Sequence, residues 1–344
     1  PELAPLDKLE ELYKFTAPRK KGLNTVEACE GILAGSVKAF VGLGGNFVRA
    51  VPDTDRMEPA WSKLRLTVQI ATKLNRNHLV HGEVAYVLPC IGRIEIDRQT
   101  SGEQAVSMED STGCFHGSRG QVEPASEKLL SEAAIVAGIA KATLPSNPAL
   151  DWDAWVGDYS KVRDAIEETY PDIFRDFNKR MWIPGGFHRP LPAANRVWKT
   201  KTGKANFFVP DSLKEDDDLD FSGHNTLRLM TLRTDDQFNT TVYGLNDRFR
   251  GVYGTRMVLL LNQGDIDRLA LKAGQIVSAR TVSNDGIERQ VDGFRVTPYN
   301  IPAGCAAGYY PECNPLIPLS HHAKLSKVPA SKSIPIELVH DSAA

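Results

Sequence analysis

Three short apolar runs in the first third of the chain constrain the fold more than any other feature. They are Ser36–Leu43, Leu64–Ile70 and Val84–Leu88, rich in β-branched or aromatic residues and closed by polar, glycine- or proline-containing segments. Hairpin turns cannot join strands that lie this far apart in the sequence, so crossover connections are required, and these favour a parallel sheet with helices on both faces. The sequence therefore predicts an α/β portion, part of a doubly wound parallel sheet, over residues 25–145.

Two segments of this portion have the pattern of helices. Thr25–Leu33 is amphipathic, and Ser131–Leu144 combines apolar residues with good helix formers before Pro145. We expect both helices to pack on the predicted sheet.

The end of the chain has a different rhythm, with short β-like runs broken by turns that contain glycine. This spacing is typical of a closed or sandwiched β domain. The runs are Leu227–Leu232, Arg256–Leu261, Ile276–Thr281, Glu288–Val296 and Ala306–Tyr310.

The stretch between these regions is rich in Trp, Pro and Phe up to residue 210 and then strongly acidic, with the run Glu215–Asp218. Such an acidic run predicts a solvated connector over residues 211–225. We therefore predict an α/β domain over residues 1–150, a wrapping segment and acidic connector over 151–221, and a β-barrel domain over 222–344.

Charge and cysteine usage exclude several classes of protein. The formal net charge is −2, so nothing attracts the chain to nucleic acid or to an anionic membrane surface, and we predict neither partner. No apolar run approaches the ~20 residues that cross a bilayer, and the N-terminus lacks a signal pattern. The five cysteines are scattered without a CxxC pair, which favours reduced thiols in a cytoplasmic protein. Because the chain begins at Pro1, we expect a fragment of a longer protein.

Two polar loops follow the first two predicted strands. Gly44, Gly45, Asn46 and Phe47 form a glycine loop that could bring backbone N–H groups close to a phosphate, although a tight turn with positive φ is the commoner explanation of an isolated glycine-rich turn. It is not the G-x-G-x-x-G fingerprint, which disfavours ordinary NAD binding. The second loop suits an anionic ligand, with a solvated surface loop as the alternative. Its candidate binding residues are Thr72, Lys73, Asn75 and His78.

A third polar run, Thr231–Thr241, follows the first predicted strand of the β domain. Its side chains could bind guanine, ribose or pyrophosphate, or they could form a turn that satisfies its own backbone. Arg233 is the residue that a turn explains least. His321 and His322 lack a third ligand at a suitable spacing, so we predict no metal site there.

Several long strings resemble one family in the same order. Gly22–Cys29, Phe40–Phe47, Pro52–Thr54, Thr72–His78 and Leu88–Arg93 are similar to formate-dehydrogenase-like molybdopterin oxidoreductase alpha subunits. The molybdopterin dinucleotide-binding domain of that family is similar to four later strings. These are Asp235–Leu245, Asp247–Gly251, Tyr309–Asn314 and Pro329–Pro335.

The resemblance implies that two molybdopterin guanine dinucleotides hold one molybdenum, with a double-psi-like β barrel capping the cofactor. It assigns cofactor contacts to the residues of the two loops named above and to a second set from the barrel side. The second set is Thr231, Arg233, Gln237, Asn239, Thr240, Tyr310, Asn314 and Lys332.

The resemblance also implies what this chain lacks. A complete member has an N-terminal half, absent here, that carries the loop facing molybdenum and in some members a 4Fe–4S cluster. That half is the expected partner, and the fragment alone is expected to be inactive. Catalytic residues, substrate and electron acceptor are left open, and no residue of the chain is nominated as a metal ligand.

Two other interpretations stay open. The chain could be a non-catalytic protein that binds or carries the pterin cofactor. It could also be a truncated remnant whose incomplete sheet exposes an apolar edge prone to aggregation.

Overall fold

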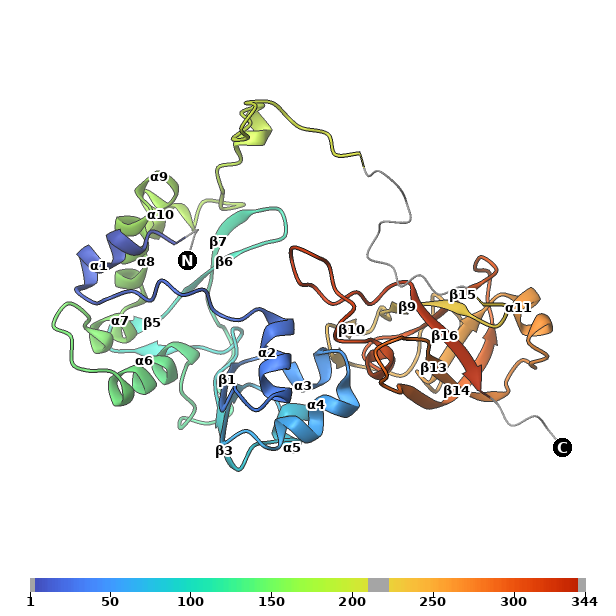
Figure 1. Ribbon diagram of the computed structural model, residues 1–344. Coiled ribbons are helices and arrows are strands. Elements are labelled where there is room, and N and C mark those ends of the chain that lie inside the picture. Colours follow the sequence, from blue (N-terminus) through green and yellow to red (C-terminus); the bar gives the residue numbers. More distant parts are fainter. Residues whose placement is uncertain (1–3, 210–222, 340–344) are drawn as a thin grey trace. The chain divides into compact units, whose positions relative to one another are not determined.

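The computed structural model describes residues 4–209 and 223–339. These residues form two compact units (Figure 1). The first comprises residues 4–22, 70–73 and 88–209, and the second comprises 23–69, 74–87 and 223–339. Most of the predicted acidic connector, residues 211–222, lies outside the described residues. The units interleave along the chain, and the sequential domain boundaries at 150 and 221 stay a prediction.

Most of the predicted sheet lies in the second unit. Its strands β1 (Ala39–Leu43), β2 (Leu66–Ala71) and β3 (Val84–Pro89) are arranged in the order β1-β2-β3. Leu66 N donates to Lys38 O at 3.4 Å and Val84 N donates to Arg65 O at 3.2 Å. Because the starts of neighbouring strands bond to one another, the three strands run parallel, as their spacing predicts.

Short helices lie beside this sheet: α2 (Thr25–Leu33), α3 (Phe47–Ala50), α4 (Thr54–Trp61) and α5 (Arg76–Leu79). A capping box at Asn24 begins α2. Phe40 of β1 packs against Trp61 of α4, with ring centroids 4.6 Å apart. Side chains alternate along a strand, so Val41 and Leu43 face the other way, and each is 55% exposed.

The rest of the second unit is a closed barrel of six strands (Figure 1). Their order is β12-β14-β13-β16-β9-β15, with β9–β15 and β12–β14 parallel and the other pairs antiparallel. The strands are β9 (Leu227–Leu232), β12 (Val258–Leu261), β13 (Ile276–Thr281), β14 (Gln290–Pro298), β15 (Cys305–Tyr309) and β16 (Ile334–Val339). The barrel also carries the small hairpin β10 (Gln237–Phe238) to β11 (Thr241–Val242), helix α11 (Gln263–Arg268) and the 3-10 turn η3 (Asn314–Leu316).

The barrel confirms the prediction of a closed β domain, and it adds a strand that the sequence did not indicate. β16 contains Pro335, a residue that argues against a strand because it cannot donate to the ladder. β16 nevertheless pairs with both β9 and β13 and closes the barrel. Its buried side chains Ile334 and Ile336 belong to the barrel core, and this tertiary burial outweighs the local signal.

The first unit corrects the predicted extent of the α/β pattern. Residues 98–118 form antiparallel hairpins, β4 (Arg98–Gln99) with β5 (Gly102–Glu103) and β6 (Val106–Glu109) with β7 (Cys114–Ser118), rather than further parallel strands. The physical reason is the short link between β6 and β7, where Thr112 N donates to the Asp110 carboxylate at 2.8 Å and stabilises a tight turn.

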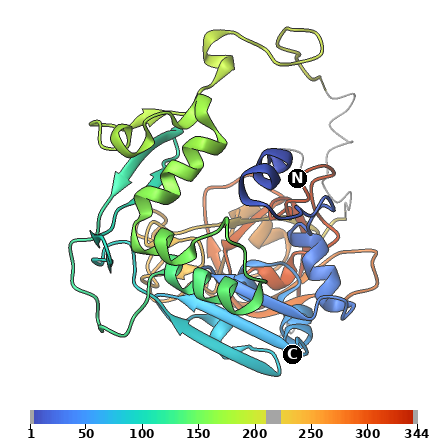
Figure 2. The same cartoon turned by 90° about the vertical axis from the view of Figure 1, so that its left-hand side faces the viewer.

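Helices fill the remainder of the first unit. α6 (Glu132–Thr143) confirms the predicted helix, with Ser131 as its N-cap. Figure 2 faces this unit and shows α8 near the β6–β7 hairpin; Ile166 of α8 packs in one core with Phe115 of β7 and Phe187 of β8. The other helices are α1 (Leu6–Tyr13), α7 (Trp152–Gly157), α8 (Tyr159–Thr169), α9 (Pro171–Phe174), α10 (Phe177–Arg180) and the 3-10 turn η1 (Pro192–Asn195), and β8 spans Phe187–His188.

No helix in residues 4–209 or 223–339 has the length and apolar character to span a bilayer.

Candidate functional site

The glycine loop and the second polar loop lie together in the second unit. Gly44 and Gly45 have φ values of +66° and +71°, a conformation that glycine adopts without strain. Asn75 Nδ2 donates to Gly45 O at 2.7 Å, and Val48 N donates to Asn77 Oδ1 at 2.9 Å. The positive φ values fit the tight-turn alternative, and the cross-loop bonds show that the turn is held against the end of the sheet.

Two residues of the second loop that the sequence nominates as ligand contacts form hydrogen bonds at the start of helix α5. Asn75 caps α5 by accepting from Asn77 N at 3.0 Å, and His78 Nδ1 accepts from Asn75 N at 2.9 Å. Thr72 and Lys73 are grouped with the first unit, so a ligand shared between them and the glycine loop stays a prediction.

Buried polar atoms without a partner lie beside the glycine loop. Asn46 Oδ1 and Gln69 Nε2 are both inaccessible and have no hydrogen-bond partner among the described residues, and Gln69 is 4% exposed. A Cβ at Gly42 would lie 2.5 Å from Gln69 Oε1, so a larger residue there would have to displace the Gln69 side chain. No atom lies within 4 Å of the Cβ position of Gly44 or Gly45. The two glycines therefore leave open space at their Cβ positions, and two buried hydrogen-bonding atoms near the loop have no partner among the described residues.

The barrel contributes a second group of predicted residues. β9 and β15 are parallel, with Leu232 opposite Tyr309, so the loops that follow them begin at the same end of the barrel. The Arg233 guanidinium lies over the Tyr310 ring, 5.4 Å from its centroid. The Lys332 ammonium donates to Thr231 O. The structure thus brings together four of the residues that the sequence nominates from this side.

Asn314 connects the barrel group to the segment that follows the glycine loop. Its Nδ2 donates to Arg49 O at 2.8 Å and to Ala50 O at 3.1 Å, both in α3. Burial raises the pKa of Tyr310, while Arg233, a hydrogen bond from Asn314, and Arg49 oppose that rise. Asn314 therefore links the barrel group to the segment after the glycine loop within the second unit, and Arg49 lies there although the sequence did not single it out.

Positive charge is concentrated at this region. Arg49, Arg233 and Lys332 all act electrostatically on Tyr310 or on one another. Burial, and then the charge of Arg233, lower the pKa of Lys332. In residues 4–209 and 223–339, no salt bridge involves any of the three cations. Arg233 and Lys332 are exposed and Arg49 is half-buried, so an anionic ligand such as a pyrophosphate can reach these cations.

Gln237 and Asn239 build the loop in which they were predicted to bind a ligand. Gln237 Oε1 accepts from Arg256 Nη2 at 2.9 Å, and its Nε2 donates to the backbone oxygens of Asn239 and Tyr310, each at 2.6 Å. Asn239 has a φ of +52° in the β10–β11 turn, and Thr240 lies in the same turn. The self-satisfying turn that the sequence left open is thus present for Gln237, and direct cofactor contacts of these three residues stay a prediction.

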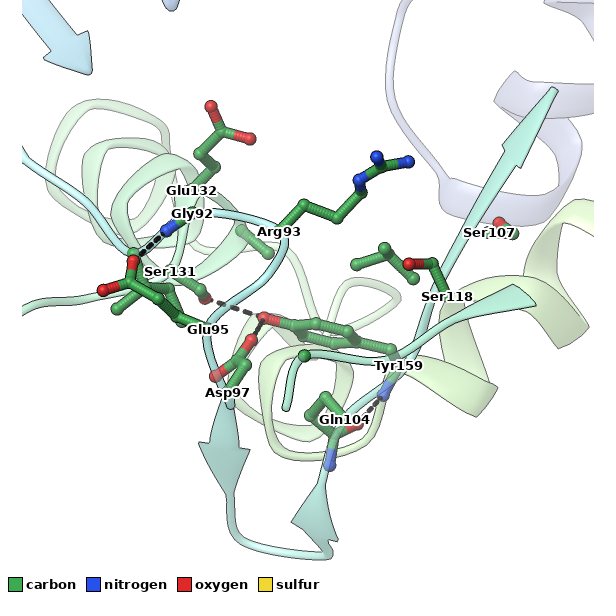
Figure 3. A pocket seen from close by; sticks show the side chains of 14 residues that line it. Gly92, Arg93, Glu95, Asp97, Gln104, Ser107, Ser118, Ser131, Glu132 and Tyr159 are labelled. Carbon is green, nitrogen blue, oxygen red and sulfur yellow. Dashed lines mark hydrogen bonds between the residues drawn. The ribbon is translucent and has the colours of Figure 1, made fainter. Parts of the chain in front are cut away.

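The first unit contains a separate polar cavity of about 350 Å³ (Figure 3). The Tyr159 hydroxyl donates to Asp97 Oδ2 at 2.5 Å and lies 2.7 Å from Ser131 Oγ. Tyr159 N donates to Gln104 Oε1 at 2.9 Å. Burial, and then the hydrogen bond to Asp97, raise the pKa of Tyr159. These groups satisfy one another, so the network stabilises the first unit.

The described residues contain no group of three or more His, Cys, Asp or Glu side chains that could hold a metal ion. All five cysteines are unpaired. Burial, and then Asp53 and Glu30, raise the pKa of Cys29 to about 12. Cys29 is therefore a packed, protonated thiol.

No family model matches the chain. Protein YdeP of Escherichia coli K12 is 41% identical over 335 residues, which cover 97% of this chain and 44% of YdeP. An uncharacterized oxidoreductase of Mycobacterium tuberculosis H37Rv is 42% identical over 337 residues, which cover 96% of this chain and 42% of that protein. The chain thus spans less than half the length of these curated relatives.

Acetylene hydratase from Pelobacter acetylenicus has a similar structure. The match has a TM-score of 0.61 at 14% sequence identity and covers 97% of this chain and 49% of the hydratase. At this identity the match shows a shared fold.

Proposed function

We propose that this chain is the cofactor-binding portion of a molybdopterin-dependent oxidoreductase, and that its second unit holds a molybdopterin guanine dinucleotide. The observation that carries the proposal is that the glycine loop and the cations Arg49, Arg233 and Lys332 lie in one compact unit, in which Asn314 of the barrel is hydrogen-bonded to the helix after the loop. On this proposal the six-stranded barrel is the dinucleotide-binding domain, of double-psi type.

The residues of the site fit such a cofactor. The three cations match the charge of its pyrophosphate, and the open space at Gly44 and Gly45 allows a phosphate or pterin to approach the backbone. Asn46 Oδ1 and Gln69 Nε2 offer an acceptor and a donor that lack protein partners, and a pterin edge carries both kinds of group. When bound, the cofactor would supply a molybdenum centre for two-electron redox chemistry.

The chain's own residues would bind and orient the cofactor. Arg233, held over Tyr310, and Lys332, anchored at the end of β9, would hold the phosphates, and Asn314 would keep α3 beside them. No residue of this chain is assigned a catalytic step. Formate as substrate follows only from the sequence resemblance.

Similar proteins support the redox class. The mycobacterial relative is named an uncharacterized oxidoreductase, and the match to acetylene hydratase supports the fold alone. Because the relatives are more than twice as long, we propose that a further half of the polypeptide completes the active site. A second dinucleotide, any 4Fe–4S cluster, the electron-transfer partner and a cytoplasmic location belong to the same proposal.

A second candidate function is a cofactor carrier without turnover. It is favoured by the fact that the cations and the glycine loop lie in one unit, so the chain could retain a dinucleotide by itself.

Molybdenum and released pterin, measured per chain on protein purified from cells that make the cofactor, test both candidates. We expect oxidised-pterin fluorescence to co-purify with the chain, and less of it with Arg233→Ala than with the control Arg98→Ala in the first unit. Redox activity only after a complementary N-terminal half is added would support the oxidoreductase. Bound pterin without activity in the completed protein would support the carrier, and no pterin in either form would contradict both.

A further inference from the structure

Arg256 is a buried cation that the sequence did not nominate, and it is 3% exposed. Its Nε donates to Glu312 Oε1 at 2.7 Å, and its Nη2 lies 3.1 Å from Glu312 Oε2. The guanidinium also lies over the Tyr309 ring, 4.7 Å from the centroid. The charge is therefore paired and enclosed, and it is not available to a ligand.

The remaining hydrogen bonds of Arg256 reach two different loops. Nη1 donates to Thr234 Oγ1 at 3.0 Å, in the loop after β9, and Nη2 to Gln237 Oε1 at 2.9 Å, at the start of β10 that this loop leads into. Nη2 also donates to Tyr310 O at 2.8 Å, in the loop after β15. Gln237 repeats the link, because its Nε2 donates to the same Tyr310 oxygen.

We infer that Arg256, with Glu312 as its counter-ion, is a positioning residue that fixes these two loops relative to each other, and so fixes Arg233 over Tyr310. The inference rests on the proposed function, since Arg233 and Tyr310 are its phosphate-side residues. Arg256 itself acts only through them.

Stability alone does not explain a buried ion pair at this place. Burying both charges costs about as much as their attraction returns, and well-packed apolar residues often do as well. A planar guanidinium, however, presents five donors in a fixed fork, which lysine cannot reproduce. Here the guanidinium donates to acceptors on two loops and to the Glu312 carboxylate at the same time. Residues that hold a binding site in place need hydrogen bonds of this kind.

Arg256→Lys in the full chain tests the inference, with Arg268→Lys as the matched control. Arg268 pairs with the buried carboxylate of Asp265, with Nη2 to Oδ1 at 2.8 Å, and Asp265 accepts from Gly304 N at 2.6 Å, just before β15. The control therefore alters a comparable ion pair at the opposite end of the same strand. The two readouts are amide hydrogen exchange of the unliganded chain and binding of guanosine diphosphate, the nucleotide portion of the proposed cofactor, by calorimetry.

We expect Arg256→Lys to speed exchange in peptides covering residues 233–240 and 309–316 and to weaken guanosine diphosphate binding by about 10- to 100-fold, the usual cost of losing a supporting partner. Arg268→Lys should leave both readouts at wild-type values. Glu312→Gln should give an intermediate effect and replaces Arg256→Lys if that variant does not fold.

Unchanged exchange in both loops would overturn the inference whatever the ligand result. Faster exchange together with unchanged nucleotide affinity would overturn it as well, because the loops would then not matter for binding. If the wild-type chain itself fails to bind guanosine diphosphate, the proposed function fails, and the exchange data still report separately on the loops.

Discussion

The Tyr159 network of the first unit and the cation cluster of the second, Arg49, Arg233 and Lys332, show two opposite ways of placing polar groups in a protein. Tyr159, Asp97, Ser131 and Gln104 donate and accept among themselves. Arg233 and Lys332 are exposed, Arg49 is half-buried, and no salt bridge within the described part of the chain involves any of the three. A satisfied network contributes stability, whereas a group of exposed like charges repels itself slightly and is accessible to an anionic ligand. The paired polar groups therefore mark the part of the chain that contributes stability, and the unpaired cations mark the part that we propose to bind the ligand.

The largest effect should come from removing the cluster. Replacing both Arg233 and Lys332 by Ala deletes two charge-assisted contacts, each worth about 1.5–3 kcal/mol. Guanosine diphosphate affinity should then fall by about 10²- to 10⁴-fold, while the urea midpoint should stay the same or rise because like charges have been removed. A lower urea midpoint with unchanged affinity would reverse the comparison and mark the cluster as structural.

Tyr159→Phe should have the converse effect. The substitution leaves the half-buried Asp97 Oδ2 without its Tyr159 donor, at a cost of about 1 kcal/mol in the free energy of unfolding. Guanosine diphosphate binding should not change. Thermal or urea unfolding measures the first quantity and calorimetry the second; a loss of affinity here would show that the two networks are coupled.

The Asp285–Arg289–Asp53 network sharpens the comparison, because it is a satisfied charge network inside the second unit. Arg289 donates to Asp53 and, at 2.8 Å, to Asp285 Oδ2. The hydrogen bond from Arg289 lowers the pKa of Asp285 to about 2 from its ordinary value of 3.8.

A lowered carboxyl pKa contributes stability that is fully present above the unfolded value and is lost as the pH falls toward the folded value. We therefore expect Asp285 to stabilise the chain by about 1–2 kcal/mol above pH ~4 and to lose this contribution between pH ~4 and ~2. Urea unfolding of the wild type and Asp285→Asn at pH 6 and pH 3 checks this. The difference between the two proteins should shrink at pH 3, and a constant difference would contradict the assignment.

Local patterns were sufficient for most of the fold. The runs that predicted β1, β2 and β3 and five of the barrel strands are apolar and bounded by turn residues, and Ser131 marks the start of α6. Patterns failed where tertiary context decides. β16 forms despite Pro335 because closing the barrel buries its side chains, and the β6–β7 hairpin forms because a tight turn replaces a crossover.

The residues of the binding region divide in the same way, into those that a local sequence pattern indicated and those that it did not. Arg233, Tyr310, Asn314 and Lys332 lie in conspicuous polar strings, and the structure brings them together. Gln69, Arg49 and Arg256 carried no such signal, since each lies in an ordinary strand, helix or loop sequence. Their roles depend on which groups lie opposite them.

The sequence by itself determined the kinds of element, the parallel sheet, the closed β domain and the polar loops at strand ends, because these depend on periodicity and turn chemistry over a few neighbouring residues. Only the tertiary structure decided which polar groups are paired and which are left unpaired. Pairing depends on residues far apart in the chain, as with Asn314 at α3, Arg256 between two loops and Arg289 at Asp53. For that reason the sequence could name candidate binding residues, and the structure could separate those that support the site from those left free to bind.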